Sequence, residues 1–187
     1  MTSLHRTTNV PHSSNLHHLA EEAVTGAIGL GVTVATAESL TAGMVAAVLA
    51  DTPGASGMLQ GGVVSYQNSV KADVLGVSRE LLDTVGAVDA QVAEAMARGA
   101  RRVCGADIGI STTGVAGPEP HGGKEVGSVF IGVATAKGSA SYGYNFDGSR
   151  PEIRGQACAA ALERLLDALA TGGYRGVTLQ GTKHDSD

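Results

Sequence analysis

The residues best suited to chemistry begin at a strand end near position 39. Val32 to Ala37 predicts a short buried strand and Thr41 to Ala50 a helix, so Ser39 falls at their junction. The N–H groups of a first helical turn lack partners within the helix and attract anions. Ser39 could therefore cap the helix, help to hold a phosphate or carboxylate, or attack a carbonyl carbon whose oxyanion is bound by nearby N–H groups.

A second group of reactive side chains follows the next predicted strand, residues 61–65. Tyr66 stands at the strand end, and Lys71 lies in the turn after it. A serine hydroxyl is a poor nucleophile without a base, and no His falls in a core segment. Lys71 is the best candidate base, provided that burial lowers its pKa. The alternative is an ordinary, exposed helix lysine.

Two further segments could contact a ligand. The loop that runs from Thr113 to Pro118 ends a predicted strand, and ligands of open α/β sheets bind beyond the carboxyl ends of the strands. Arg150 and Arg154 share one face at the start of the last predicted helix, where a cation opposes the helix dipole. A bound phosphate would reconcile these charges with the dipole, and a solvated surface pair is the alternative.

The composition excludes several other classes of function. The 187 residues suit one domain, and the formal net charge of −5 without a basic stretch argues against nucleic-acid binding. No apolar run is long enough to span a membrane, and the histidines show no metal-site spacing. Cys104 and Cys158 fall in predicted helices without a CxxC motif, which indicates reduced, buried thiols and a cytoplasmic location.

The order of predicted elements indicates an α/β layered fold with a mixed sheet. Residues 1–13 are expected to form a disordered lead, 14–171 the folded domain, and 172–187 a disordered tail. A strand pair near the C-terminus is expected to form an antiparallel hairpin. The predicted helices cover residues 14–28, 41–50, 68–75, 78–84, 90–104 and 149–170, and the predicted strands cover 32–37, 61–65, 107–112, 126–136 and 140–146.

Taken in order, these segments resemble the C-terminal domain of the CinA competence/damage-inducible proteins, a family that includes stand-alone nicotinamide-nucleotide amidases. The resemblance covers about residues 16–170. It is carried by Thr36-Ala37-Glu38-Ser39 with Thr41 and Gly43, Gly61 to Val64 with Tyr66, Asn68 and Lys71, Leu75-Gly76-Val77, Gly86-Ala87-Val88, Thr113 to Pro118 with Val126-Gly127, and Arg150 with Arg154.

The resemblance implies a three-layer α/β/α sandwich with a mixed, mostly parallel sheet, and a homo-oligomer. It implies hydrolysis of nicotinamide mononucleotide to nicotinate mononucleotide and ammonia, with no metal or organic cofactor. Ser39 matches the nucleophile, Lys71 its activating partner and Tyr66 an assisting residue. The positions expected to contact the pyridine nucleotide are Glu38, Thr41, Gly43, Asn68, Thr113, Gly114, Ala116, Gly117, Arg150 and Arg154.

The chain departs from the family pattern immediately after the serine. The family often has Cys and then Thr-Gly-Gly there, whereas this chain has Leu40 and Ala42. Leu40 removes a thiol but keeps the backbone N–H, and Ala42 is expected to crowd the site. Two alternatives therefore stand beside the amidase: a weakly catalytic pyridine-nucleotide-binding or regulatory module, and a hydrolase of a different amide or phosphate ester.

Overall fold

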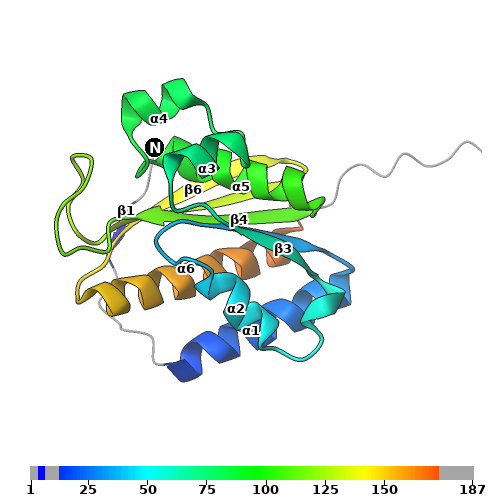
Figure 1. Cartoon of the computed structure of the whole chain (residues 1–187). Helices are drawn as coiled ribbons and strands as arrows, with labels where there is room; N and C mark the ends of the chain where they lie inside the picture. The colour runs from blue at the N-terminus through cyan, green and yellow to red at the C-terminus, as the bar shows by residue number, and fades with distance from the viewer. Residues whose placement is uncertain (1–3, 7–12, 173–187) are drawn as a thin grey trace, which may run out of the picture.

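A computed structural model of the chain describes residues 4–6 and 13–172, and Figure 1 shows a central sheet between helices. The sheet has six strands in the order β1-β6-β5-β4-β2-β3. Three of its five pairings are parallel (β1/β6, β2/β3, β2/β4) and two are antiparallel (β4/β5, β5/β6). The strands are β1 (Leu4–Arg6), β2 (Val34–Glu38), β3 (Leu59–Val64), β4 (Ile108–Gly114), β5 (Ser128–Thr135) and β6 (Gly138–Asn145).

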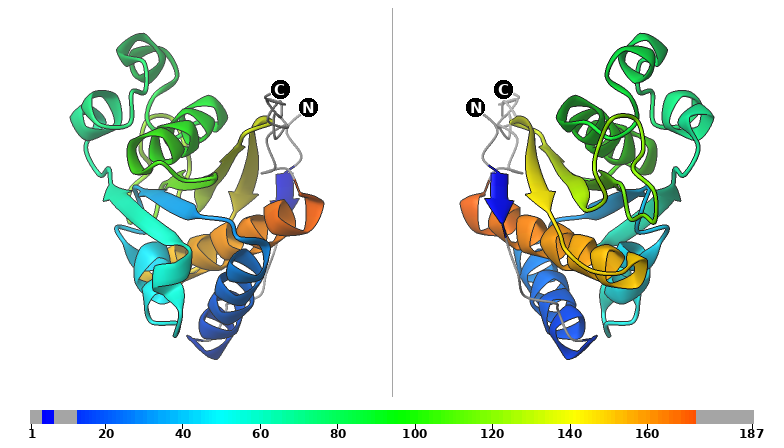
Figure 2. Two further views of the ribbon diagram at one scale, coloured as in Figure 1. Left: turned by 90° about the vertical axis from the view of Figure 1, so that its right-hand side faces the viewer. Right: turned by 90° about the vertical axis from the view of Figure 1, so that its left-hand side faces the viewer.

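Helices cover both faces of this sheet (Figures 1 and 2). One face carries α1 (Ser13–Leu30), α2 (Met44–Ala50) and α6 (Arg150–Thr171), and the other carries α3 (Asn68–Asp73), α4 (Arg79–Val85) and α5 (Ala90–Cys104). A short 3-10 helix, Ala55–Gly57, connects α2 to β3. The predicted three-layer α/β/α sandwich with a mixed, mostly parallel sheet is therefore confirmed.

Each helical layer packs on the sheet through its own apolar cluster. The larger cluster includes Val34, Ile110 and Leu162, and the smaller one includes Ala35 and Met96. The neighbouring residues Val34 and Ala35 enter different clusters because successive side chains of a strand point to opposite faces. Every residue of β2 is buried, as expected for a strand covered on both sides.

Helix α5 approaches the sheet so closely that glycine is required beneath it. A Cβ atom on Gly109 would lie 2.0 Å from the carbonyl oxygen of Ala97, and one on Gly132 would lie 2.2 Å from that of Ala93. Ser111, between them in the sheet, donates its hydroxyl to the Ala93 carbonyl oxygen at 2.5 Å. The glycine-rich composition thus lets α5 lie close to β4 and β5.

The structure differs from the sequence predictions at two places. Residues 4–6, predicted as part of a disordered lead, form β1 beside β6, whereas the rest of that lead and residues 173–187 of the predicted tail lie outside the described residues. The helix predicted from Thr41 begins only at Met44. The junction that contains Ser39 is therefore a longer turn than predicted, between the end of β2 at Glu38 and the start of α2 at Met44.

Ala42, in this turn, has φ 52°, the left-handed region that disfavours a Cβ atom. Its side chain is exposed and does not line the cavity described below, so the predicted crowding of the site is wrong. We expect Ala42→Gly to raise the free energy of unfolding by about 1 kcal/mol, measured by urea denaturation. Ala47→Gly, at an exposed position inside α2, is the control and should lower stability by about 0.5–1 kcal/mol. A loss of stability in Ala42→Gly would contradict the strain at this position.

Candidate active site

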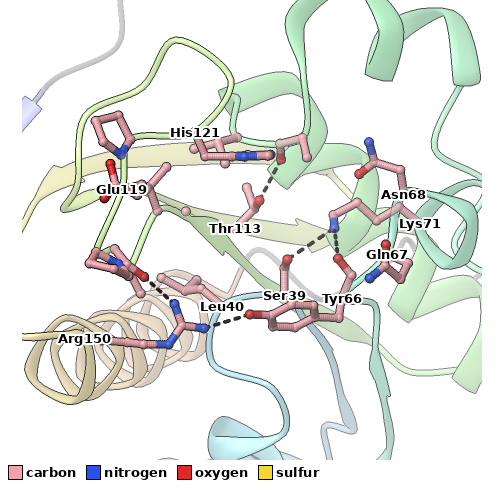
Figure 3. Close-up of a pocket in the computed structure, with 18 residues that line it drawn as sticks. Ser39, Leu40, Tyr66, Gln67, Asn68, Lys71, Thr113, Glu119, His121 and Arg150 are labelled. Atoms are coloured by element: carbon pink, nitrogen blue, oxygen red, sulfur yellow. Dashed lines mark hydrogen bonds between the residues drawn. The ribbon is translucent and has the colours of Figure 1, made fainter.

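A cavity of about 560 Å³ lies beyond the carboxyl ends of β2, β3 and β4, the place where α/β sheets bind ligands. Figure 3 shows the side chains that line it. They come from the turn after β2, the segment after β3 with α3, the link between α4 and α5, the end of β4 with the loop after it, and the first residue of α6. The predicted residues among them are Ser39, Tyr66, Asn68, Lys71, Thr113, Gly114, Ala116, Gly117 and Arg150.

Ser39 and Lys71 meet at one end of this cavity. The Lys71 Nζ atom lies 3.2 Å from the Ser39 Oγ atom, although 32 residues separate them in the sequence. The same Nζ atom donates to the carbonyl oxygens of Ser65 at 2.8 Å and Tyr66 at 3.2 Å (Figure 3). The Ser39 side chain therefore faces Lys71, and it is not the cap of the following helix.

The Lys71 side chain is buried in the protein interior. It lies on the inner face of α3, a helix of six residues, and only 1% of its surface is exposed. Burial disfavours the charged ammonium and lowers the pKa of Lys71 from 10.5 to about 8. A neutral amine keeps two N–H donors for the two carbonyl oxygens and has a lone pair free for the Ser39 hydroxyl proton. Burial therefore lowers the pKa of Lys71, as the role of base for Ser39 requires.

Tyr66 contributes to this arrangement differently from the sequence prediction. Its carbonyl oxygen accepts from Lys71, but its side chain is 52% exposed and its hydroxyl accepts from Arg150 Nη2 at 2.8 Å. Arg150 Nη1 donates to the Gly117 carbonyl oxygen at 2.7 Å. Arg150 thus joins the segment after β3 to the loop after β4 across the cavity (Figure 3).

The segment from Thr113 to Gly117 lines one wall of the cavity. Thr113 is fully buried, and its hydroxyl donates to the Ala87 carbonyl oxygen at 2.7 Å. A Cβ atom on Gly114 would lie 2.7 Å from the Ser128 carbonyl oxygen, so glycine is needed where β4 leaves the sheet. Thr113 therefore fixes this wall, and the small residues after it leave room for a ligand.

Glu38 and Thr41, predicted to contact the ligand, contact the protein instead. The Glu38 carboxylate accepts from the N–H groups of Gly43, Val45 and Ala46 at 2.8, 3.0 and 2.8 Å, so it caps α2. Thr41 donates its hydroxyl to the same carboxylate at 2.8 Å. Neither residue lines the cavity, and Gly43 does not line it either. The first N–H groups of α2 are thus occupied and cannot bind a substrate oxyanion, contrary to the sequence interpretation.

The two arginines have different surroundings. Arg150 lines the cavity, whereas Arg154 does not line it and donates to the carbonyl oxygens of Leu40 at 2.8 Å and Thr41 at 2.9 Å. The prediction that Arg154 contacts a ligand is therefore not supported by its contacts. Arg150 remains as the cation that a phosphate could reach.

Several cavity residues were not singled out from the sequence as ligand contacts. They are Leu40, Gln67, Ala87, Val88, Val115, Pro118, Glu119, Pro120 and His121. Glu119 to His121 extend the loop after β4, and Ala87 and Val88 connect α4 to α5. The signal that could have found them is their place inside or beside the quoted motifs: Leu40 follows Ser39, Gln67 lies between Tyr66 and Asn68, and the others lie in or next to Gly86-Ala87-Val88 and Thr113 to Pro118.

The described residues also bear on metal binding, membrane insertion and thiol chemistry. In residues 4–6 and 13–172, no three His, Cys, Asp or Glu side chains gather as a metal site would require. Over the same ranges no helix has the length and apolar character of a membrane span. Cys104 and Cys158 are unpaired thiols, and burial, with the nearby Glu38 charge, raises the pKa of Cys158 to about 12. Cys158 is thus a neutral core side chain.

Known proteins are similar to this chain in both sequence and fold. The CinA C-terminal domain family matches residues 16–169. A CinA-like protein from Frankia casuarinae is 46% identical over 138 residues, which are 74% of this chain and 32% of that protein. This chain spans about a third of the length of the curated relatives it matches.

Solved structures give the same assignment over most of the chain. A CinA superfamily protein from Klebsiella pneumoniae superposes with a TM-score of 0.81 at 30% identity, covering 83% of this chain and 98% of that one. The competence/damage-inducible protein CihA from Agrobacterium tumefaciens gives 0.80 at 35% identity, covering 88% and 99%. Sequence and structure agree, and the chain belongs to the CinA C-terminal domain family.

Proposed function

We propose that this domain is an amidohydrolase that converts nicotinamide mononucleotide and water to nicotinate mononucleotide and ammonia. The observation that carries the proposal is the buried Lys71 Nζ atom, 3.2 Å from Ser39 Oγ, with a lowered pKa. A nucleophile within hydrogen-bond reach of a base that is partly neutral near pH 7 is the arrangement that covalent amide hydrolysis needs. With a pKa of about 8, about one Lys71 in ten is neutral at pH 7.

The reaction proceeds in two halves. Lys71 takes the Ser39 proton as Oγ attacks the carboxamide carbon, and it returns that proton to the departing nitrogen as the C–N bond breaks and ammonia leaves. Lys71 then removes a proton from water, which attacks the acyl ester. The ester C–O bond breaks, Ser39 regains a proton, and the carboxylate product leaves.

Charge on the carboxamide oxygen needs a donor other than the occupied start of α2. The N–H group of Leu40 directly follows the nucleophile, and Leu40 lines the cavity. Among the hydrogen bonds of residues 4–6 and 13–172, none uses this N–H group. Leu40 is therefore our candidate oxyanion donor, and its side chain, buried in the core, does not oppose that role.

Arg150 is our candidate for the substrate phosphate. A phosphate at Arg150 orients the carboxamide toward Ser39 and contributes binding energy away from the reacting bond. Arg150→Ala is expected to raise KM for nicotinamide mononucleotide by about 10–100-fold and to leave kcat within a few-fold. Nicotinamide riboside, which lacks the phosphate, gives the matched comparison, and steady-state kinetics on both substrates measures the difference.

Comparing the two substrates also tests whether Arg150 binds the phosphate. Because the riboside cannot use a phosphate site, its kcat/KM should hardly change in Arg150→Ala. An equal loss with both substrates would mean that Arg150 acts through its bonds to Tyr66 and Gly117. Arg79, exposed on α4 and paired with Asp73, supplies the control variant Arg79→Ala, with both KM values unchanged.

Ammonia release from nicotinamide mononucleotide by the purified protein tests the proposed function, with the product identified by mass. We expect ammonia and nicotinate mononucleotide in equal amounts. Binding of the nucleotide without ammonia release would contradict the proposal and favour the binding or regulatory module. Ammonia release from other amides only would place the activity on a different substrate.

A further inference from the structure

The Glu38 side chain, at the end of β2, is among the most completely buried charged groups in the described part of the chain. Only 1% of its surface is exposed. Both carboxylate oxygens act as acceptors, as an ionised carboxylate requires. The donors are Thr36 Oγ1 at 3.2 Å and Ala46 N at 2.8 Å on Oε1, and Thr41 Oγ1 at 2.8 Å, Gly43 N at 2.8 Å and Val45 N at 3.0 Å on Oε2.

These bonds enclose the turn that contains Ser39, residues 39–43, which we term the nucleophile turn. The Glu38 backbone leads directly into Ser39, and its Oε2 atom binds both the middle of the turn at Thr41 and its end at Gly43. One carboxylate therefore ties the middle and the end of the turn to the start of α2, and the Glu38 backbone fixes where the turn begins. The turn cannot change shape without breaking hydrogen bonds to this buried carboxylate.

The backbone around Ser39 transmits this constraint to the reactive oxygen. The Ser39 N–H donates to the Thr112 carbonyl oxygen at 2.9 Å, and the Glu38 carbonyl oxygen accepts from the Ser65 N–H at 2.8 Å. Ser65 also supplies a carbonyl oxygen to Lys71. Glu38 thus borders the nucleophile through its own backbone and the base through Ser65.

We propose that Glu38 is a positioning residue, whose buried carboxylate holds the nucleophile turn so that Ser39 Oγ meets Lys71 Nζ. This inference rests on the proposed roles of Ser39 and Lys71. It assigns Glu38 an effect on the reaction rate without contact to the substrate. The start of α2 is closed to other anions because the Glu38 carboxylate already occupies it.

Glu38→Gln tests the proposal because the amide keeps the shape of the side chain but replaces one acceptor oxygen with an NH₂ group. Some of the five donors then face another donor, and the turn must shift. A displacement near 1 Å costs about 10²-fold in rate, so we expect kcat to fall by about 10²-fold while KM changes little. The reaction of Ser39 with a sulfonyl fluoride, followed by intact mass, should slow by a similar factor, and it requires no knowledge of the substrate.

Asp107→Asn is the matched control. Asp107 accepts from the Thr33 N–H at 2.9 Å and the Thr33 hydroxyl at 2.8 Å, so it holds backbone at the opposite end of β2. We expect both variants to lower Tm, and only Glu38→Gln to lower kcat and the labelling rate, measured well below both Tm values. Equal kcat and labelling rates in the two variants would overturn the proposal.

A crystal structure of Glu38→Gln gives a direct second readout, in which the distance between Ser39 Oγ and Lys71 Nζ should exceed hydrogen-bonding range. An unchanged distance of 3.2 Å together with unchanged labelling would show that Glu38 is only structural. If Glu38→Gln does not fold, Thr41→Val removes one of the five donors to Glu38, together with the 2.7 Å hydrogen bond between the Thr41 and Thr112 hydroxyls, and should reduce labelling by about tenfold. If the wild type releases no ammonia, the proposed function fails, while the distance still decides the role of Glu38.

Discussion

Ser39→Ala is expected to lower kcat for ammonia release by at least about 10⁴-fold, since the first bond to the carboxamide carbon can no longer form. The Ser39 hydroxyl hydrogen-bonds to Lys71 at the cavity wall and does not cap α2, so the variant should fold with an unchanged Tm. KM should also change little if Arg150 and the loop after β4 supply most of the binding. Coupled ammonia detection and a thermal melt on the same preparation measure both effects.

Ser69→Ala is the control for this variant, because Ser69 lies exposed on α3, two residues before Lys71. Its rate should match that of the wild type. A Ser39→Ala variant with more than a tenth of wild-type kcat would mean that water attacks the substrate directly, and Ser39 would lose the role of nucleophile.

Lys71→Met is expected to lower kcat by about 10³-fold or more, because the Ser39 proton then has no acceptor of matched basicity. Lys71→Arg should be as inactive, although it keeps the positive charge, because guanidinium does not lose its proton near neutral pH. Comparing the two variants shows whether Lys71 must accept a proton or need only carry a positive charge. Steady-state kinetics from pH 6 to 10 measures both variants.

Lys137→Met, at an exposed lysine in the turn between β5 and β6, is the control and should keep wild-type activity. Substantial activity in Lys71→Arg would contradict the base assignment and leave Lys71 an electrostatic role. Activity in Lys71→Met with an unchanged pH profile would remove Lys71 from the mechanism.

Much of the fold could be predicted from the sequence because local signals and tertiary packing agree. Asp89 precedes the amphipathic run of α5 and caps it through the Gln91 N–H at 2.8 Å. Ser149 and Pro151 mark the start of α6, where the capping box forms with Glu152. The strand β1 could not be predicted, because its three residues are too few to show an alternating pattern and they pair with β6, which is distant in the sequence.

The candidate site was predicted less completely, for a physical reason that Glu38 illustrates. The family resemblance implied that Glu38 contacts the ligand, but the side chain turns back onto the start of α2. The spacing of residues in the sequence does not show whether a side chain points toward a ligand or back toward the following helix. Arg150 and Arg154 present the same difficulty, since both share a helix face and only the packing of α6 beneath the nucleophile turn separates them.

That Ser39 and Lys71 lie near each other could be expected from the sequence, because parallel strands bring the segments after their carboxyl ends together. The burial of Lys71 could not be predicted in this way. It depends on tertiary packing that places the Lys71 side chain of α3 against the carbonyl oxygens of Ser65 and Tyr66. The lowered pKa of Lys71 therefore depends on the folded domain, and it sets the fraction of neutral amine that can accept the Ser39 proton.

The pH dependence of kcat/KM for ammonia release from nicotinamide mononucleotide tests the Ser39–Lys71 pair most directly. The neutral amine is the active form, so kcat/KM should rise with pH, level off above a midpoint of about 8, and lack this rise in Lys71→Met. A profile that is flat between pH 6 and 9, or that falls through that range, would contradict a buried lysine as the base for Ser39.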